Sequence, residues 1–382
     1  MTAAQPAPRP RRSLVGRIIA LVAVPITAVA GALVVGAVII VISSLVRGSL
    51  DLMLPLQAYG NMFEGAFGSL RGILFSIVSA TPLILGGMAV ALGFKAGLFN
   101  IGVQGQFLIG ALGSAVVGAY LAGASPFLAI PGAILAGALL GAAWGFIPGA
   151  LKAWTGAHEV VTTIMLNFIA GAIIGYLITG PLEAPGFSFS RTGALGNAEL
   201  PTFFGTSIHL GVFIAFAAVP VVWWLLWRST LGFEIRTVGA NPDAARYAGM
   251  RPAVLTILTM SLCGLLAGLA GAGQILGITH FMNASYGTSI GFDSISVALL
   301  GRAHPVGITL AALLFGAMRA GSGLMQIEAG IPPELIDVIQ ATILLFLAAD
   351  LVIRRALRIR APSAEPDELQ TVTKSYGSGT PT

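Results

Sequence analysis

Long apolar runs follow one another along almost the whole chain, separated by short polar stretches. A helix that crosses the hydrocarbon core of a bilayer needs about 20 predominantly apolar residues. The pattern predicts ten membrane segments, of which the eighth and ninth are too short to cross alone. These segments cover residues 18–46, 72–94, 98–122, 127–151, 160–179, 209–227, 254–278, 289–300, 305–319 and 335–353. We therefore expect an all-α polytopic membrane protein with about ten transmembrane segments, including broken or re-entrant helices.

The composition excludes a soluble domain. Hydrophobic residues make up 56% of the 382 residues and charged residues only 9%, whereas roughly a quarter of the residues in soluble proteins are charged. Mean hydropathy is +0.91. Many of the 50 glycines lie inside the apolar runs, where small residues let membrane helices approach closely. The single cysteine, Cys263, can form neither an intrachain disulfide nor a multi-cysteine metal site.

Polar ends flank one transmembrane domain at 18–353. Residues 1–17 hold four arginines among Pro and Ala, but the apolar run that follows is too long for a signal peptide and has no small-residue cleavage site. We expect an uncleaved first helix, with 1–17 and 354–382 disordered. Lys and Arg collect on the cytoplasmic side of membrane proteins, and placing both termini there puts most basic residues on that side. The net charge of +5 thus indicates orientation in a bacterial inner membrane rather than a nucleic-acid partner.

Two polar interruptions break the membrane pattern, one in each half of the chain. The first, 97–106, holds three glycines with Asn100, Gln104 and Gln106, and the second extends over 291–307. Irregular backbone at membrane depth is tolerated only where it is buried in protein or lines a cavity, and paired interruptions point to a transporter's binding region. The three amide side chains are therefore candidates for the translocation pathway. The alternative is that they only bond neighbouring helices for packing.

A third polar stretch predicts one inward face of a helix. Glu159, Thr163 and Asn167 recur at four-residue spacing and so share a side of the helix. Thr163 and Asn167 join the pathway candidates. His158 and Glu159 lie near the predicted cytoplasmic end, where ions are solvated at little cost. A solvated or interhelical role is therefore favoured over a proton relay.

The longest predicted internal cytoplasmic segment covers 228–251. Asn241 can cap a helix that has Pro242 at its first position, Asp243 suits the positive amino end, and Gly249 can end it. The pattern predicts a capped helix of about two turns. A short rigid helix tied between two membrane segments is suited to docking into a groove on a partner protein.

Four motifs are together similar to those of a known permease family. Residues 243–249, D-A-A-R-Y-A-G, resemble the E-A-A-x-x-x-G loop of ATP-binding-cassette (ABC) importer permeases, although the later I-x-L-P portion is not evident. The others are F-N-I-G-V-Q-G-Q at 99–106, H-E-V-V-T-T-I-M-L-N at 158–167 and A-L-L-G-R-A-H-P-V-G at 298–307. Over about 72–350 the chain resembles branched-chain amino acid/ribose-type permeases, closest to nucleoside and simple-sugar permeases that work with a basic-membrane-protein-type lipoprotein. That family usually has Glu where this chain has Gln104.

The resemblance implies an assembly of several polypeptides. It implies two permease subunits, often different ones, two ATPase subunits and an extracytoplasmic binding lipoprotein. The ATPase-coupling residues it indicates are Glu234, Arg236, Asp243, Ala244, Ala245, Arg246 and Gly249. The chain has no G-x-x-x-x-G-K-[ST] phosphate loop. We therefore expect ATP to be used by the partner ATPase, with no cofactor bound by this chain and no enzymatic activity of its own.

A nucleoside is the preferred cargo, because uncharged polar groups and aromatic rings suit a sugar joined to a base. A simple sugar such as ribose is the alternative within the class. An ion-coupled secondary transporter is a second possibility, for which Asp293, Asp337 and Asp350 are the intramembrane carboxylates by position. A membrane-embedded enzyme is disfavoured, because no paired His or carboxylate motif has metal or nucleophile spacing.

Overall fold

The fold is entirely helical in the part of the chain that the structure, a computed structural model, describes. Those residues are 14–46, 48, 50–203, 205–286 and 288–348, and they contain two isolated β-bridges but no strand. The α-helices are α1 (Leu14–Val46), α2 (Leu54–Phe67), α3 (Leu70–Lys95), α4 (Val103–Tyr120), α5 (Pro126–Thr155), α6 (Glu159–Ile178), α7 (Leu210–Arg228), α8 (Thr230–Ala240), α9 (Pro242–Tyr247), α10 (Pro252–Gln274), α11 (Ile290–Leu300), α12 (Pro305–Ala329) and α13 (Glu334–Ala348). Short helical turns at Gly196–Ala198 and Ile275–Thr279 complete the list.

Eight of the described helices are long and apolar enough to cross a membrane. They are α1 from Pro25, α3, α4, α5, α6, α7, α10 with the π-helical turn that continues it to Thr279, and α12. Helix α11 is apolar but has only 11 residues. The expected polytopic all-α fold, with a short helix near 290–300, is therefore confirmed.

The structure corrects several predicted boundaries. The segment 305–319 was expected to be too short to cross, but α12 continues to Ala329 and ends where Gly330 takes a left-handed conformation. The segment 98–122 becomes helical only at Val103. Helix α2 was not predicted, because polar residues interrupt its apolar pattern; it packs on α12. Residues 14–17 of the expected leader belong to α1, whereas 1–13 and 354–382 lie outside the described residues.

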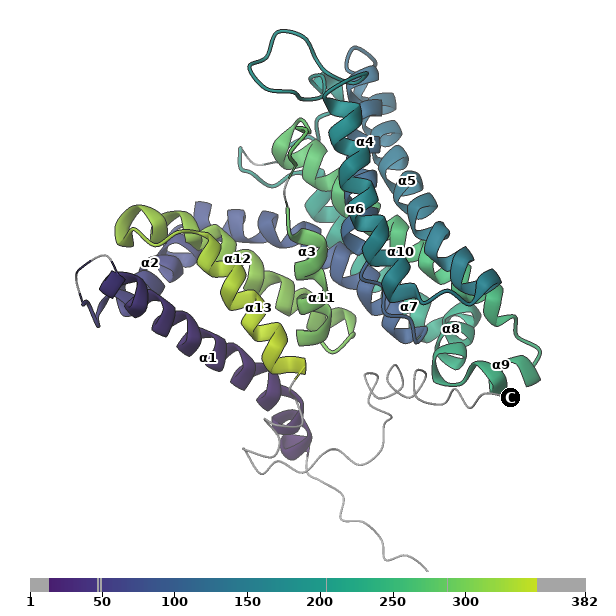
Figure 1. The fold of residues 1–382 in the computed structure, drawn as a ribbon, viewed down its shortest axis with the longest axis horizontal. Helices are drawn as coiled ribbons and strands as arrows, with labels where there is room; N and C mark the ends of the chain where they lie inside the picture. Colours follow the sequence, from purple (N-terminus) through teal and green to yellow (C-terminus); the bar gives the residue numbers. More distant parts are fainter. Residues whose placement is uncertain (1–13, 47, 49, 204, 287, 349–382) are drawn as a thin grey trace, which may run out of the picture.

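The helices form two groups joined by α3 and α11 (Figure 1). In one group α10 packs along α5 and α4, and in the other α12 packs against α2. Helix α3 contacts both α10 and α12, and α11 contacts α3, α4, α12 and α13. Small residues make the closest approach possible, since a β-carbon on Gly141 of α5 would lie 2.7 Å from the α-carbon of Gly268 of α10. Helices α3 and α11 therefore lie between the two groups.

Basic residues gather at one end of the bundle. The Lys95 ammonium at the end of α3 lies 5.5 Å from the ring centroid of Trp227 near the end of α7, and the His304 ring before α12 lies 5.4 Å from the same ring. Helix α8 packs beside them, since a β-carbon on Gly239 would overlap the carbonyl oxygen of Lys95. Helices α8 and α9 lie at this end as well (Figure 1).

Candidate translocation site and coupling surface

The first predicted interruption forms a buried, non-helical connection between α3 and α4, residues 96–102, which we call the α4 break. Gly97 in it has a φ of 70°, a conformation that glycine adopts without strain. Asn100 accepts a hydrogen bond from the N–H of Gly102 at 3.0 Å and exchanges two side-chain bonds with Gln106, at 3.1 and 3.3 Å. Both side chains are buried. The two amides thus fix the backbone that enters α4.

Helix α6 supports the other side of the same turn. Asn167 accepts a bond from the N–H of Gly105 at 2.8 Å and donates to the carbonyl oxygen of Ile101 at 3.1 Å. Thr163 is fully buried, donates to the carbonyl oxygen of Glu159 at 2.6 Å, and lies where a β-carbon on Gly102 would be 2.9 Å away. The predicted inward face of α6 therefore packs on the α4 break.

Gln104 connects the two interruptions that the sequence separates. Its side chain donates to the carbonyl oxygen of Thr288 at 2.7 Å and accepts from the N–H of Gly291 at 2.8 Å. Thr288 and Gly291 flank the start of α11. The starts of α4 and α11 therefore meet inside the bundle, in the arrangement of discontinuous helices found at transporter binding regions.

All five pathway candidates come together around these two helix starts. Each makes its hydrogen bonds to protein groups, mostly to backbone. This geometry is consistent with the alternative that the amide side chains serve packing. Buried amides whose hydrogen-bonding groups all have partners stabilise a backbone turn. The side chains set the shape of the α4 break and the position of α11 beside it.

Next to this site, the structure pairs two charges that the sequence treated separately. Asp293, in the first turn of α11, accepts a hydrogen bond and ion pair from Arg319 of α12. Asp293 was a candidate ion-coupling carboxylate, and Arg319 was expected at the end of a short segment. No local pattern signals the pair, because the residues lie 26 positions apart on different helices. Asp337 lies in α13, and Asp350 is outside the described residues.

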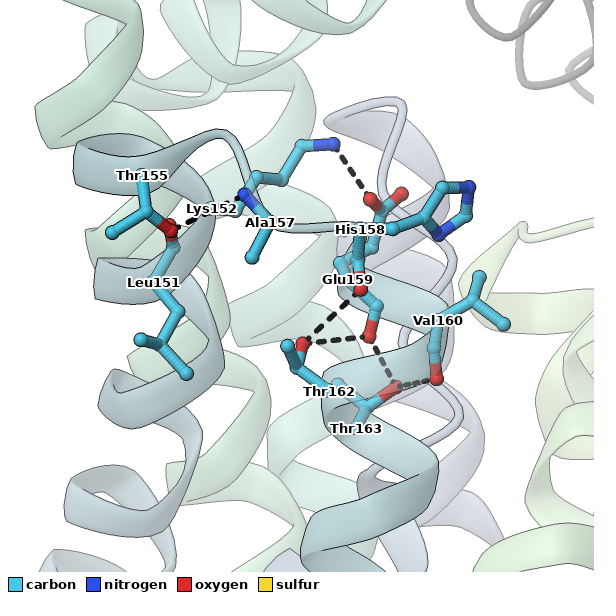
Figure 2. Close-up of polar contacts among 9 residues, drawn as sticks. All are labelled: Leu151, Lys152, Thr155, Ala157, His158, Glu159, Val160, Thr162 and Thr163. Atoms are coloured by element: carbon cyan, nitrogen blue, oxygen red, sulfur yellow. Dashed lines mark hydrogen bonds and ion pairs between the residues drawn. The ribbon is translucent and has the colours of Figure 1, made fainter.

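Glu159 forms an ion pair across the α5–α6 turn, shown in Figure 2. Its carboxylate accepts from the Lys152 ammonium at 2.6 Å, and only 1% of its side chain is exposed. The neighbouring hydroxyls of Thr162 and Thr163 point back to carbonyl oxygens of the first turn of α6 (Figure 2). Of the solvated and interhelical roles expected for Glu159, this buried pair favours the interhelical one.

The predicted cytoplasmic segment at 228–251, called the coupling segment below, forms two helices. Asn241 caps α9, and its side-chain oxygen accepts from the N–H groups of Asp243 and Ala244, both at 3.0 Å. Gly249 follows with a φ of 83°. The caps lie where the sequence placed them, although α9 has only six residues and α8 precedes it as a separate helix of 11.

Exposure divides the predicted coupling residues. Asp243, Ala244, Arg246 and Gly249 are exposed, and Glu234 and Arg236 are half-buried. Ala245 is fully buried, so it packs α9 onto the rest of the permease. Two exposed aromatic residues of this segment were not among the predicted coupling residues: Tyr247, which is 94% exposed, and Phe233, which is 56% exposed. Aromatic residues often anchor protein–protein contacts, so aromatic residues in a polar, capped segment are the sequence signal that points to them.

The coupling segment lies directly against the α4 break. A β-carbon on Gly97 would lie 3.0 Å from the carbonyl oxygen of Gly239 in α8. From there the α4 break leads to Asn100, whose side chain bonds to Gln106 of α4, and Gln104 of the same helix bonds to Gly291 of α11. A displacement of α8 and α9 thus has a short covalent and packed route to the meeting point of α4 and α11.

Comparison with known proteins gives consistent matches. The model of a family described as "Branched-chain amino acid transport system / permease component" matches residues 72–348. The guanosine ABC transporter permease protein NupP of Bacillus subtilis is 38% identical over 87% of this chain and 94% of its own. The glucose ABC transporter permease protein TsgB13 of Haloferax volcanii and the nucleoside ABC transporter permease protein NupB of Lactococcus lactis are each 36% identical, over 85% of this chain and 86% and 90% of theirs. Each organism also has a second ABC permease that matches at 27–28%. No solved structure matches.

Proposed function

Given that this chain belongs to the family of branched-chain amino acid transport system permease components, we propose that its cargo, as a membrane permease subunit of an ABC importer, is a nucleoside. The importer role follows from the relatives, which are nucleoside and sugar ABC permeases, and it replaces the ion-coupled alternative. Two of the three relatives at 36–38% identity are named for guanosine or nucleosides and one for glucose. A simple sugar is therefore the second candidate cargo.

The proposed transport mechanism is supported mainly by the contact between the starts of α4 and α11 at Gln104. Two discontinuous helices start inside the bundle there, and the α8–α9 surface lies against the segment that leads into one of them. In the proposed cycle, ATP-driven closure of the ATPase pair moves α8 and α9, and the permease alternates between inward-open and outward-open states. Asn100, Gln104, Gln106, Thr163 and Asn167 shape the translocation pathway by holding its backbone.

The proposed ATPase contact is the exposed side of the coupling segment. It consists of Asp243, Ala244, Arg246 and Gly249 with Tyr247 beside them, bordered by Glu234 and Arg236. Arg246 and Asp243 lie 3.7 Å apart and both are exposed, so each remains available to a partner. Ala245 acts from beneath by holding α9 in place.

The proposed assembly contains further polypeptides. An ATPase pair and an extracytoplasmic binding lipoprotein follow from the importer class. We propose a different paralogue as the second permease, since three organisms each have two matching permeases, one at 36–38% and one at 27–28% identity. In this assembly ATP belongs to the ATPase, and this transport component needs no cofactor of its own.

The proposed orientation puts both termini in the cytoplasm of a bacterium. Lys95, Lys152 and Arg228 end α3, α5 and α7, which places positive charge on the side where it accumulates in membrane proteins. The loop between α6 and α7 then faces outward. Its residues 190–192 pair with 282–284 of the segment before α11, through bonds such as the Thr192 N–H to the Met282 carbonyl at 2.9 Å.

The test is co-purification of the tagged chain from detergent-solubilised native membranes, followed by reconstitution and an uptake assay with radiolabelled guanosine and ribose. Recovery of an ATPase and a second permease, with guanosine uptake that needs ATP and the binding protein, is the expected result. Uptake of ribose alone would reassign the cargo. ATP-independent uptake driven by an ion gradient would overturn the importer mechanism.

A further inference from the structure

Three side chains join the start of α11 to α12. Arg319 donates to the carboxylate of Asp293 and to the hydroxyl of Ser289, the second bond at 3.0 Å. The Ser289 hydroxyl in turn donates to the same carboxylate at 2.7 Å. Ser289 is the residue before α11, and Asp293 is in its first turn, where the positive end of the helix dipole stabilises a negative charge.

The pair lies at membrane depth. Arg319 is about 21 Å along α12 from Pro305, at 1.5 Å per residue, within a hydrocarbon core of about 30 Å. The side chains of Arg319 and Asp293 are 24% and 12% exposed. An isolated charge here would be costly, so each residue needs the other. Asp337 of α13 lies near enough for its charge to act on Asp293.

The start of α11 is thereby fastened from two sides. Arg319 of α12 contacts Asp293 and Ser289, and Gln104 of α4 contacts Gly291 and Thr288. The described residues before it, 281–286 and 288–289, are non-helical, and Asn283 pairs with Arg191 of the loop between α6 and α7. The start of α11 is therefore positioned by these contacts and not by a continuous helix before it.

We propose that Asp293 and Arg319 are positioning residues for transport, whose ion pair sets where the start of α11 stands beside the start of α4. This rests on the proposed function, since it names the contact that holds one of the two helix starts of the pathway. In this structure the charge of the carboxylate is compensated by Arg319. Transport needs the pair as a unit: either charge alone displaces α11.

The test uses four variants in the full complex: Asp293→Asn, Arg319→Gln, the double variant with both changes, and Arg319→Lys. Uptake of radiolabelled guanosine is normalised to the level of tagged chain in the membrane. In parallel, spin labels at Phe292→Cys of α11 and Ile327→Cys of α12, both exposed positions, report the distance between the two helices. Cys263 is the only native cysteine, so a Cys263→Ala background removes unwanted labelling. Arg71→Gln, an exposed arginine at the start of α3, is the matched control.

Each single neutral variant is expected to lower uptake about tenfold or more and to shift or broaden the label distance, because it leaves a lone buried charge. The double variant is expected to recover uptake to within about threefold of the wild type, with the wild-type distance. Arg319→Lys should retain most uptake, and Arg71→Gln should change neither measurement. Normal uptake in the single variants, or lost uptake with an unchanged distance, would overturn the proposal. If the wild-type complex takes up no guanosine, the proposed cargo fails while the distances still test the positioning role.

Discussion

The side chain of Gln104 accepts a hydrogen bond from the backbone N–H of Gly291, which lies 187 residues later in the chain. The N–H groups of a helix's first turn have no partner within the helix, so this bond supplies one for α11 from the start of α4. The same amide donates to Thr288. One side chain thus joins the starts of α4 and α11, and its loss should destabilise both.

Replacing Gln104 with Leu should destabilise the permease by about 2 kcal/mol or more, since it leaves the Thr288 carbonyl and the Gly291 N–H unpaired in a buried site. Guanosine uptake should fall with it. Thermal unfolding in detergent and uptake at matched membrane level measure the two effects. Gln326→Leu, at an exposed position on α12, is the control. Equal behaviour of the two variants would show that the Gln104 bonds contribute little.

The close contact of α5 and α10 predicts opposite outcomes for one substitution at two glycines. Gly141→Ala places a β-carbon against the backbone of Gly264 and Gly268, which cannot move aside as a side chain can, so the helices must separate and stability should fall. Gly171→Ala, on the exposed side of α6 with no atom near its β-carbon, should be neutral or gain up to about 1 kcal/mol. Thermal unfolding of both variants distinguishes them. A Gly141 variant as stable as the Gly171 variant would contradict the packing shown here.

Tyr247→Ala should weaken association with the ATPase about tenfold or more, because an exposed aromatic anchor at the centre of an interface often contributes about 2 kcal/mol. The stability of the permease itself should not change, since the side chain is 94% exposed. Binding of purified ATPase to immobilised permease measures the effect. Tyr120→Ala, a residue 88% exposed at the end of α4, serves as the comparison and should bind normally. Unchanged binding by the Tyr247 variant would remove this residue from the contact.

The Lys152 and Glu159 pair predicts a non-additive pair of substitutions. Lys152→Met leaves the buried Glu159 carboxylate without its ammonium partner, which should cost about 1–3 kcal/mol given that Lys152 is 30% exposed and partly screened. Adding Glu159→Gln should recover part of that loss. A double-mutant cycle on thermal unfolding gives the coupling energy. Strictly additive effects would show that the two side chains act independently.

Low pH should destabilise the protein through His209. Burial, and secondarily the charge of nearby His280, lower the pKa of His209 to about 4, whereas the unfolded chain titrates near 6.5. Between these values only the unfolded state binds the proton, so the free energy of unfolding decreases as pH falls from about 6.5 to about 4, by up to about 3 kcal/mol.

Replacing His209 with Asn should flatten that pH dependence. Asn can still accept the bond that His209 takes from the N–H of Gly211 at 3.1 Å, since Asn is a favoured helix cap. Melting temperatures between pH 4 and 7 measure the slope, with His158→Asn as the control that should retain it. A slope that persists in the His209 variant would assign the effect to other groups.

Local signals explain which parts of the fold could be predicted. Apolar runs of spanning length located most membrane helices, and the Asn241 cap located α9, because both depend on residues close together in the chain. Arg319 is a residue for which local signals gave a wrong boundary. A charge was treated as the end of a segment, but α12 continues through it because Asp293 compensates the charge from another helix.

The candidate site divides in the same way. Its residue types and the two interruptions could be read from the sequence, since polar residues stand out in apolar runs. Their partners could not, because the bonds from Gln104 to Gly291 and from Asn167 to Gly105 join residues 187 and 62 positions apart. Burial of Ala245 was likewise invisible, because it depends on how α9 packs against the helices around it.

The backbone of Gly239 in α8 rests on the backbone of residues 95–97 with no side chain between them. Rotatable side chains absorb small movements, and a contact that lacks them is stiff. A shift of α8 by a fraction of an ångström therefore arrives at the α4 break almost undiminished. In mechanical terms this junction has low compliance, so a force applied to α8 is passed to the α4 break with little loss.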